Sequence, residues 1–357
     1  MRRVLWVLLA LIVVAAGIIL GISGYAASSL TRFERVPIEC NPADFGLEYV
    51  DVSFPSRDGL MLRGWWLEAG DDRPVIVVVH GSEGNRAHPA ERMLGIAKDL
   101  VSYGYNVLMF DMRGHGESEG KHISAGYYER NDLLGAIDYI RQRGIESKIG
   151  VLGFSMGAAT SLIAAAESEE IDAVVADCAY ADIVSIIESE FSRRSNLPKF
   201  FIPIILFIAK NIYDVDFTAI KPEEAVREIS VPVFIIHGGQ DDMVPVQHAY
   251  RLKEASQNPD SKLWIVPEAQ HANSYLLRPA EYKEQVISFF DEALDLDWDS
   301  SEGGSNAELA SRMETDTEQS PEMLLSCTLR NVAPYLHSMF WIPQPIDTSF
   351  ASDTIAL

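Results

Sequence analysis

Hydrophobic positions along the chain follow two alternating patterns. Short, nearly continuous apolar runs rich in Val and Ile are typical of strands buried on both faces, and apolar residues at helical spacing are typical of helices packed on a sheet. The runs predicted as strands are 47–54, 60–67, 74–79, 106–110, 149–152, 173–176, 231–236 and 263–266. The stretches predicted as helices are 93–101, 127–141, 158–166, 247–256 and 282–294. This alternation predicts an α/β fold with a mainly parallel sheet covered by helices on both faces.

Two segments depart from this rhythm. Arg57-Asp58-Gly59 between the first two strands is a hairpin signal. Residues 179–230 interrupt the alternation, and within them the run 197–209 is very apolar but too short and too interrupted by proline to span a bilayer. The run could form a lid over a site, a lipid-facing patch or a helix packed on the sheet, and we predict a small helical lid insertion.

The N-terminal segment has the composition of a membrane span. Val4 to Ile22 carries no charge and follows Arg2 and Arg3, and its length as a helix, about 28 Å, is close to the thickness of the hydrocarbon layer. We predict an uncleaved transmembrane helix over residues 1–25 and a linker over 26–46. A cleaved signal peptide is the alternative, because small residues occur at 26–28.

The charges that flank this segment predict its orientation. Arg2 and Arg3 precede it, whereas Arg32 and Arg35 lie farther out on the other side and are offset by Glu34. The positive-inside rule then places the N-terminus in the cytoplasm and the globular domain outside it. We therefore expect a single-pass membrane protein with an extracytoplasmic domain.

Composition limits the remaining possibilities. The chain has 357 residues, of which 48% are hydrophobic, so residues 47–296 can form one large domain. A net charge of −23 makes nucleic acid an unsuitable partner. Residues 297–357 begin with an acidic stretch rich in Ser, Gly and Glu, which predicts a disordered tail. The chain has no helical His-x-x-x-His or Cys-x-x-Cys, phosphate loop or dinucleotide fingerprint, so we expect neither a metal nor a cofactor.

The sequence Gly153-Phe154-Ser155-Met156-Gly157 lies between a predicted strand and a predicted helix. In this context G-x-S-x-G forms a turn so tight that side chains two residues before and after the serine have no room. The turn exposes the Ser155 hydroxyl as a candidate nucleophile. The Met156 N–H then points to where an oxyanion would form.

A serine nucleophile needs a histidine base and an acid that orients it. His271 follows the last predicted strand and fits the chain order serine, acid, histidine. His80 and His237 end strands directly before glycine, so we expect them to support turns. Three acids between Ser155 and His271 follow strands and stay open as candidates from the residues alone: Asp177, Asp241 and Asp242.

Five motifs occur together in this chain: 80–85 (HGSEGN), 111–118 (DMRGHGES), 153–157 (GFSMG), 237–245 (HGGQDDMVP) and 270–271 (QH). Together they resemble the α/β-hydrolase superfamily, and within it the membrane-anchored serine hydrolases of the Bem46 and serine-aminopeptidase-like groups. The resemblance covers about residues 47–296 and implies an α/β-hydrolase fold. It also implies Asp241 as the acid, three residues after the glycine of its His-Gly motif, and Ser82 as the second oxyanion donor besides Met156.

These features predict a serine hydrolase that cleaves an acyl ester or thioester through an acyl-enzyme on Ser155, with Asp241 and His271 completing the triad. A peptidase or aminopeptidase-type amide hydrolase is the alternative chemistry. A non-catalytic binding protein on the same fold is the alternative class. We expect a small-molecule or lipid-like acyl substrate, and contact with the membrane through the N-terminal helix.

Overall fold

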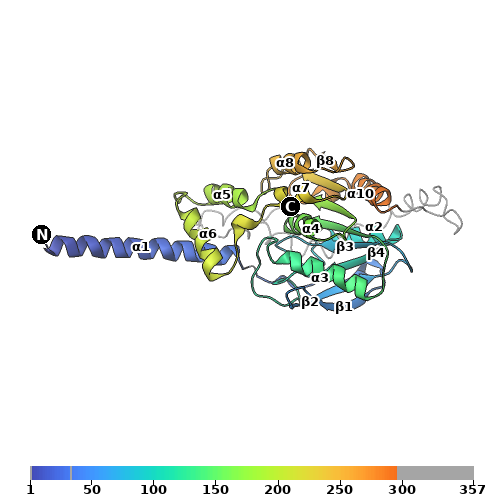
Figure 1. The fold of residues 1–357 in the computed structure, drawn as a ribbon, viewed down its shortest axis with the longest axis horizontal. Helices are drawn as coiled ribbons and strands as arrows, with labels where there is room; N and C mark the ends of the chain where they lie inside the picture. The colour runs from blue at the N-terminus through green and yellow to red at the C-terminus, as the bar shows by residue number, and fades with distance from the viewer. Residues whose placement is uncertain (1, 33, 296–357) are drawn as a thin grey trace, which may run out of the picture.

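An eight-stranded sheet runs through the middle of the domain (Figure 1). The structure is a computed structural model that describes residues 2–32 and 34–295, so the predicted tail over 297–357 lies outside the described residues. The strands lie in the order β1-β2-β4-β3-β5-β6-β7-β8. Their bounds are β1 (Val50–Pro55), β2 (Met61–Leu67), β3 (Val75–Val79), β4 (Asn106–Phe110), β5 (Ile149–Phe154), β6 (Ala173–Asp177), β7 (Val233–Gly238) and β8 (Lys262–Val266).

Strand pairing confirms the predicted mainly parallel sheet. β4, β3, β5, β6, β7 and β8 pair in parallel, whereas β1 pairs with β2 and β2 with β4 in antiparallel fashion. The predicted hairpin joins β1 to β2, with Gly59 at φ 93°, a conformation that glycine adopts without strain. Every residue of β3, β5 and β6 is buried, which explains why these strands are continuously apolar in sequence.

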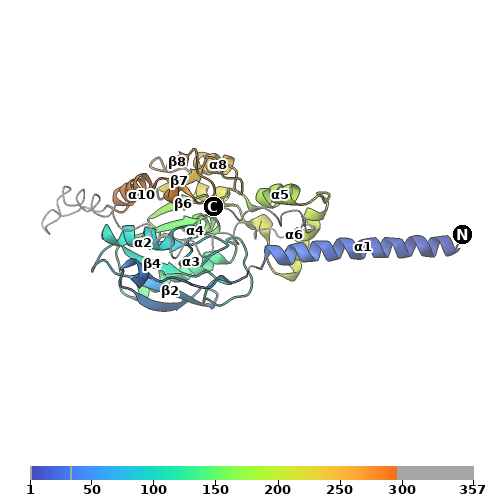
Figure 2. The same ribbon diagram turned by 180° about the vertical axis from the view of Figure 1, so that it is seen from behind.

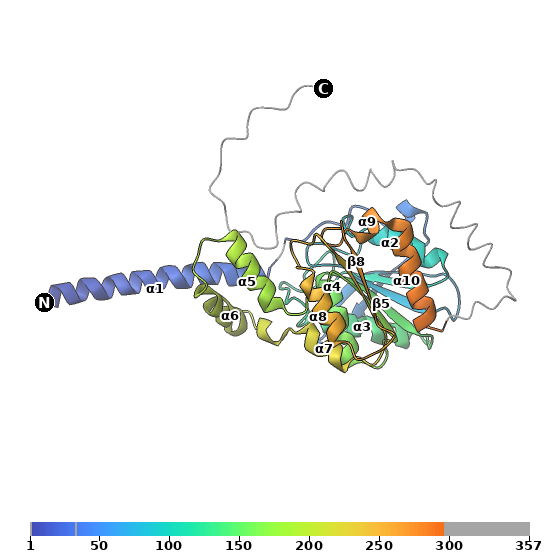
Figure 3. The ribbon, with the colours of Figure 1, turned by 90° about the horizontal axis from the view of Figure 1, so that it is seen from above.

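Helices cover both faces of the sheet (Figure 3). The core on one face holds side chains of α3, α4, α7 and α8, and the core on the other face holds those of α2 and α10. The bounds are α2 (Met93–Ser102), α3 (Glu129–Gln142), α4 (Met156–Glu167), α7 (Pro222–Glu228), α8 (Gln247–Ala255), α9 (Ser274–Leu277) and α10 (Pro279–Ala293), and a 3₁₀ helix, η1, spans Pro42–Phe45.

The interruption of the strand–helix rhythm is a small helical insertion. It comprises α5 (Ile183–Arg194), α6 (Phe201–Ile212) and the 3₁₀ helix η2 (Phe217–Ala219). These elements share a third apolar cluster, separate from the two sheet cores. The insertion is smaller than the predicted range 179–230, because Val226 of α7 packs in the core beneath the sheet.

The N-terminal helix α1 (Arg2–Leu30) projects from the domain at one end (Figures 1 and 2). It has 29 residues, a mean hydropathy of 3.0 in its most apolar stretch and no burial there, so its length and composition suit a membrane span or a signal sequence. The helix continues beyond the boundary predicted at residue 25. Its last third packs against the insertion, where Ile19, Ile22, Ala26, Ala27 and Leu30 join the third apolar cluster.

The segment that follows α1 lies against the domain. The Arg35 guanidinium donates to the carbonyls of His115, Gly116 and Gly120 at 2.8–2.9 Å. The Asn85 side-chain amide donates to the carbonyl of Val36 at 3.1 Å. The range predicted as a linker is therefore held to the domain by specific hydrogen bonds.

Candidate active site

Ser155 occupies the sharp turn between β5 and α4. Its backbone adopts φ 51° and ψ −114°, and its N–H donates to the Asp177 carbonyl at 2.8 Å. A Cβ on Gly153 would lie 2.5 Å from the Gly157 carbonyl oxygen, and a Cβ on Gly157 would lie 2.4 Å from the carbonyl oxygens of Val79 and His80. Both distances are shorter than any tolerable contact, so the turn requires glycine at both positions.

The hydroxyl of Ser155 begins a chain of two hydrogen bonds. Ser155 Oγ lies 2.8 Å from His271 Nε2, and His271 Nδ1 lies 2.7 Å from Asp241 Oδ2. Because a carboxylate only accepts, Nδ1 carries the proton and Nε2 is free to accept from the serine hydroxyl. The structure thus brings together the three residues predicted as nucleophile, base and acid.

The loop after β7 fixes Asp241 and separates it from the other two candidate acids. Asp241 Oδ1 accepts from the N–H groups of Met243 at 2.9 Å and Val244 at 2.8 Å. Asp242 is exposed and pairs with Arg193 at 3.3 Å. Asp177 accepts from the Tyr282 hydroxyl at 3.0 Å. Asp241 is therefore the candidate that contacts His271.

The electrostatic interaction between His271 and Asp241 favours a protonated imidazole beside an ionised carboxylate. Burial lowers the pKa of His271, but the adjacent Asp241 carboxylate outweighs this effect and the net pKa is raised. Burial raises the pKa of Asp241, and the interaction with His271 together with the Val244 N–H reverses it, so that the net pKa is lowered. Asp241 therefore stays ionised beside an imidazole that it helps to protonate.

The predicted oxyanion donors flank the serine. Met156 is the first residue of α4, so its N–H has no carbonyl partner within the helix. The loop that contains Ser82 lies close to Ser155, because a Cβ on Gly81 would lie 3.4 Å from Ser155 Cβ. The Ser82 carbonyl accepts from His115 Nε2 at 2.8 Å, which fixes the orientation of this peptide. The role of the Ser82 and Met156 N–H groups stays a prediction.

A buried carboxylate that the sequence did not single out holds the same loop. Glu91 is buried and accepts the Gly81 N–H at 3.0 and 3.1 Å through its two oxygens. Burial lowers the pKa of His271, whereas Asp241 and, less strongly, the Glu91 carboxylate raise it. Glu91 lies in the loop before α2, where no motif marks it, and only the fold brings it to Gly81.

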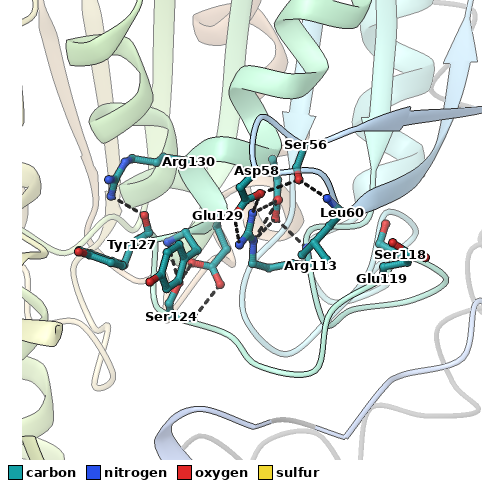
Figure 4. Close-up of polar contacts among 12 residues, drawn as sticks. Ser56, Asp58, Leu60, Arg113, Ser118, Glu119, Ser124, Tyr127, Glu129 and Arg130 are labelled. Atoms are coloured by element: carbon teal, nitrogen blue, oxygen red, sulfur yellow. Dashed lines mark hydrogen bonds and ion pairs between the residues drawn. The ribbon is translucent and has the colours of Figure 1, made fainter. Parts of the chain in front are cut away.

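The 111–118 motif has a structural role in the described domain. Asp111 accepts the Arg86 N–H at 2.7 Å and the Glu117 N–H at 2.9 Å, and it also pairs with the Arg86 guanidinium. Arg113 donates to Asp58 in the β1–β2 turn (Figure 4), and it also donates to Asp132 on α3. The motif therefore ties the hairpin, α3 and the loop of Ser82 together.

The two histidines expected to support turns do so. His80 Nε2 accepts the Met112 N–H at 3.0 Å, and burial, with the nearby His115, holds the pKa of His80 well below its usual range. His237 Nε2 donates to the Val244 carbonyl at 2.7 Å, which holds the loop of Asp241. Both interpretations from sequence are confirmed.

Among the described residues, one group of potential metal ligands gathers near the triad. Donor atoms of Cys178, His237 and Asp241 lie within 4.8 Å of one another. Asp241 Oδ2 already accepts from His271, and His237 Nε2 carries the proton that it donates to Val244. These contacts make the group part of the support for Asp241, and we assign no metal to it.

Comparison with known proteins shows which family this chain belongs to. The sequence profile of the α/β-hydrolase fold matches residues 74–201. The chain is 31% identical over 249 residues to YqkD of Bacillus subtilis, covering 69% of this chain and 80% of that one. It is 30% identical over 262 residues to YfhR of Salmonella typhi, covering 69% and 83% of the two chains. The fold, the profile and these relatives show that this chain belongs to the α/β-hydrolase superfamily.

A solved esterase structure resembles this chain in both fold and sequence. The esterase Pf2001 of Pyrococcus furiosus superimposes with a TM-score of 0.63 and 29% sequence identity, covering 74% of this chain and 99% of that chain. The fold together with this esterase neighbour supports a hydrolase.

Proposed function

We propose that this protein is a membrane-anchored serine hydrolase that cleaves acyl esters or thioesters through an acyl-enzyme on Ser155. The hydrogen-bonded chain from Ser155 through His271 to Asp241 carries this proposal. The similarity to an esterase favours ester cleavage over peptide cleavage.

In the acylation step, Ser155 Oγ attacks the substrate carbonyl carbon while His271 Nε2 takes the hydroxyl proton. Asp241 stabilises the imidazolium, and the N–H groups of Ser82 and Met156 donate to the oxyanion. When the tetrahedral intermediate collapses, the bond to the leaving alkoxide or thiolate breaks. His271 gives its proton to that leaving group, and the acyl group stays on Ser155.

Deacylation repeats these steps with water as the nucleophile. His271 removes a proton from water as the water oxygen attacks the acyl carbonyl carbon, and the second tetrahedral intermediate collapses with cleavage of the bond between that carbon and Ser155 Oγ. The serine oxygen recovers the proton from His271, and the acyl chain leaves as a carboxylic acid. The cycle needs no group besides the three side chains, the two N–H donors and water.

Ser155→Ala tests the nucleophile. The smaller side chain fits the same turn, so the fold stays intact, and turnover should fall by several orders of magnitude. A fluorophosphonate probe should label the unchanged chain and not the variant. Retention of more than about a tenth of the activity would show that Ser155 is not the nucleophile, and failure of the unchanged chain to react with the probe would favour a binding protein.

Acyl esters of graded length, assayed beside aminoacyl amides, decide between ester and peptide cleavage.

We also propose that α1 remains in the mature protein as a single transmembrane anchor, with the domain outside the cytoplasm. The full chain should stay with membranes through a carbonate wash. Protease added to right-side-out vesicles should digest the domain. Protection of the domain from protease would show the opposite topology. Recovery of a soluble chain that begins near Ala27 would show that residues before it are a cleaved signal peptide and not an anchor.

A further inference from the structure

Helix α6 has two apolar faces, and one of them points away from the domain. Phe201, Ile205 and Ile208 are buried in the third apolar cluster. Phe200 and Phe207, with 52% and 67% of their surface exposed, lie with exposed Pro203 on the opposite side. The spacing of three and seven residues from Phe200 places these three side chains in one stripe. We call this stripe the α6 outer face.

The α6 outer face belongs to a helix that packs against α1 through its other side. The two helices pack against each other, and Ile19, Ile22 and Ala26 of α1 enter the cluster that holds the buried side of α6. All three views show α6 beside the last part of α1 (Figures 1, 2 and 3). The exposed part of α1, which carries Val4 to Ile18, lies on the far side of this junction from the sheet.

Helix geometry gives the depth of this junction. A hydrocarbon layer of about 30 Å accommodates about 20 helical residues, so a span that begins at Val4 ends near Ser23. Two exposed aromatic residues lie near these limits: Trp6 is 68% exposed and Tyr25 is 47% exposed. Aromatic side chains favour the two membrane–water boundaries. The α6 helix therefore contacts α1 at the level where α1 leaves the hydrocarbon.

We propose that the α6 outer face is a second membrane contact, embedded in the headgroup boundary of the leaflet from which α1 emerges. This inference rests on the proposed anchoring role of α1. Aromatic and proline side chains supply the apolar surface that such a boundary takes up. Exposed Lys199 lies two residues before α6, where a long cationic side chain can extend toward lipid phosphates. Exposed Lys210, in the last turn, pairs with Asp216 at 2.5 Å.

The contact would bring the reacting residues close to the lipid surface. The cluster beneath α6 also contains Ala159, which lies one helical turn beyond Ser155, and Val244, whose N–H holds Asp241. One apolar cluster thus connects the α6 outer face with the two ends of the candidate triad. A bilayer is the occupant that this continuity favours, because α1 runs from the same cluster into the proposed membrane span.

Site-specific fluorescence on the full chain tests this proposal. Phe207→Cys and, separately, Phe200→Cys would carry an environment-sensitive label in vesicles of phosphatidylcholine and phosphatidylglycerol, with and without nitroxide-labelled phosphatidylcholine. The matched control is Tyr250→Cys on α8, since Tyr250 is an aromatic residue with 53% exposure on a helix that packs on the sheet core and not in the cluster shared by α1 and α6. The unsubstituted chain, treated in parallel, measures labelling of the native cysteines.

We expect blue-shifted emission at both α6 positions and at least twofold quenching by the nitroxide lipid, with neither effect at position 250. Emission and quenching at positions 200 and 207 equal to those at 250 would overturn the proposal. Blue-shifted emission without lipid quenching would also overturn it, because a second copy of the chain would then cover the face.

The same samples separate this inference from the proposals that precede it. Release of the chain by a carbonate wash would refute the proposed anchoring role of α1 and, with it, the proposed membrane contact of α6. Retention after the wash, with unquenched labels, would refute the α6 contact alone. Fluorophosphonate labelling of Ser155 in these vesicles reports on the catalytic proposal independently of both.

Discussion

His271 contacts a serine on one side of its ring and a carboxylate on the other. The balance of burial and the Asp241 charge sets its pKa, and the charge prevails. In the proposed mechanism the base must be neutral to accept the serine proton, so we expect the reaction to slow as pH falls through the pKa of His271. In the proposed triad, the Asp241 charge thus has two effects: it stabilises the imidazolium that forms during the reaction, and it lowers activity at low pH.

Asp241→Asn should show separately how Asp241 stabilises the imidazolium and how it raises the pKa of His271. We expect turnover to fall on the order of 10⁴-fold, because the imidazolium loses its partner and the tautomer is no longer fixed. Since Asp241 raises the pKa of His271, its removal lowers that pKa, and the acidic limb of the pH–rate profile moves to lower pH. Asp242→Asn is the matched control and should change little, because Asp242 pairs with Arg193 at the surface. A larger effect at position 242 would place the acid there.

Glu91→Gln tests the carboxylate that holds Gly81. The amide keeps one acceptor for the Gly81 N–H, so the fold should survive, while the loss of charge lowers the pKa of His271 and shifts the acidic limb slightly to lower pH. Glu91→Ala leaves that buried N–H without a partner, at a cost of about 1–3 kcal/mol. Thermal unfolding and the pH–rate profile of both variants would show this. An unshifted profile in Glu91→Gln would limit Glu91 to a structural role.

The sequence identified some of these residues more readily than others. Ser155 and His271 followed from a strand–turn–helix motif and from chain order, which are local features. The choice between Asp241 and Asp242 required the family resemblance, since both follow the same strand. Glu91 could not be found, because its contact with Gly81 spans ten positions and depends on the path of a loop without a repeating pattern.

The turn between β5 and α4 shows how two elements together determine one residue. The helix starts so close to β3 that the carbonyls of Val79 and His80 fill the place of a side chain at position 157. This contact fixes the direction in which α4 leaves the sheet. The position of Ser155 therefore depends on three neighbouring backbones and not on the serine itself.

Gly157→Ala should consequently destabilise the domain. Overpacking of this kind costs about 1–3 kcal/mol, which lowers Tm by about 2–4 °C per kcal/mol in a domain of this size. Gly95→Ala is the matched control, because Gly95 lies within α2 and a Cβ there would come no closer than 3.4 Å to the Tyr275 hydroxyl, an ordinary van der Waals contact. That variant should be neutral or stabilising. Equal unfolding temperatures for the two variants would contradict the steric account.

Element boundaries were the least predictable part of the fold. The apolar run that marks α1 ends at Ile22, yet the helix continues to Leu30 because its next turns pack on α6, which lies about 180 positions away in sequence. Similarly, Val226 and Ile229 suit either a lid or a core helix, and only the position of α7 against α4 assigns them to the core. Local patterns identify an element, whereas its end depends on what it contacts.

At the scale of the whole molecule, α1 is part of the domain as well as a candidate anchor. Ala27 and Thr31 are fully buried, and Ile123 donates its N–H to the Thr31 carbonyl at 3.0 Å. Removing the helix would therefore uncover apolar side chains of α6 on a second side. The domain and the packed part of α1 therefore form one folded unit.

Two truncations test this coupling. A chain that starts at Ile19 keeps the packed turns of α1, and a chain that starts at Arg32 loses them. Each buried aliphatic side chain contributes about 1.5–3 kcal/mol, so we expect the shorter chain to unfold at a lower temperature and to self-associate without detergent. Calorimetry and size-exclusion chromatography of both chains would show the difference. Identical behaviour would mean that the packing of α1 on α6 adds no stability.

The unbroken course of α1 into the domain has a kinetic consequence. If α1 anchors the chain as proposed, a lipid-like ester substrate would reach the enzyme by diffusion in two dimensions, and the mole fraction of that ester among the lipids would set the encounter rate. Diluting such an ester with inert lipid would slow its hydrolysis, whereas diluting the vesicles with buffer would leave the rate per enzyme unchanged. Water-soluble esters would show the opposite behaviour, because their supply depends on the volume around the membrane and not on its area.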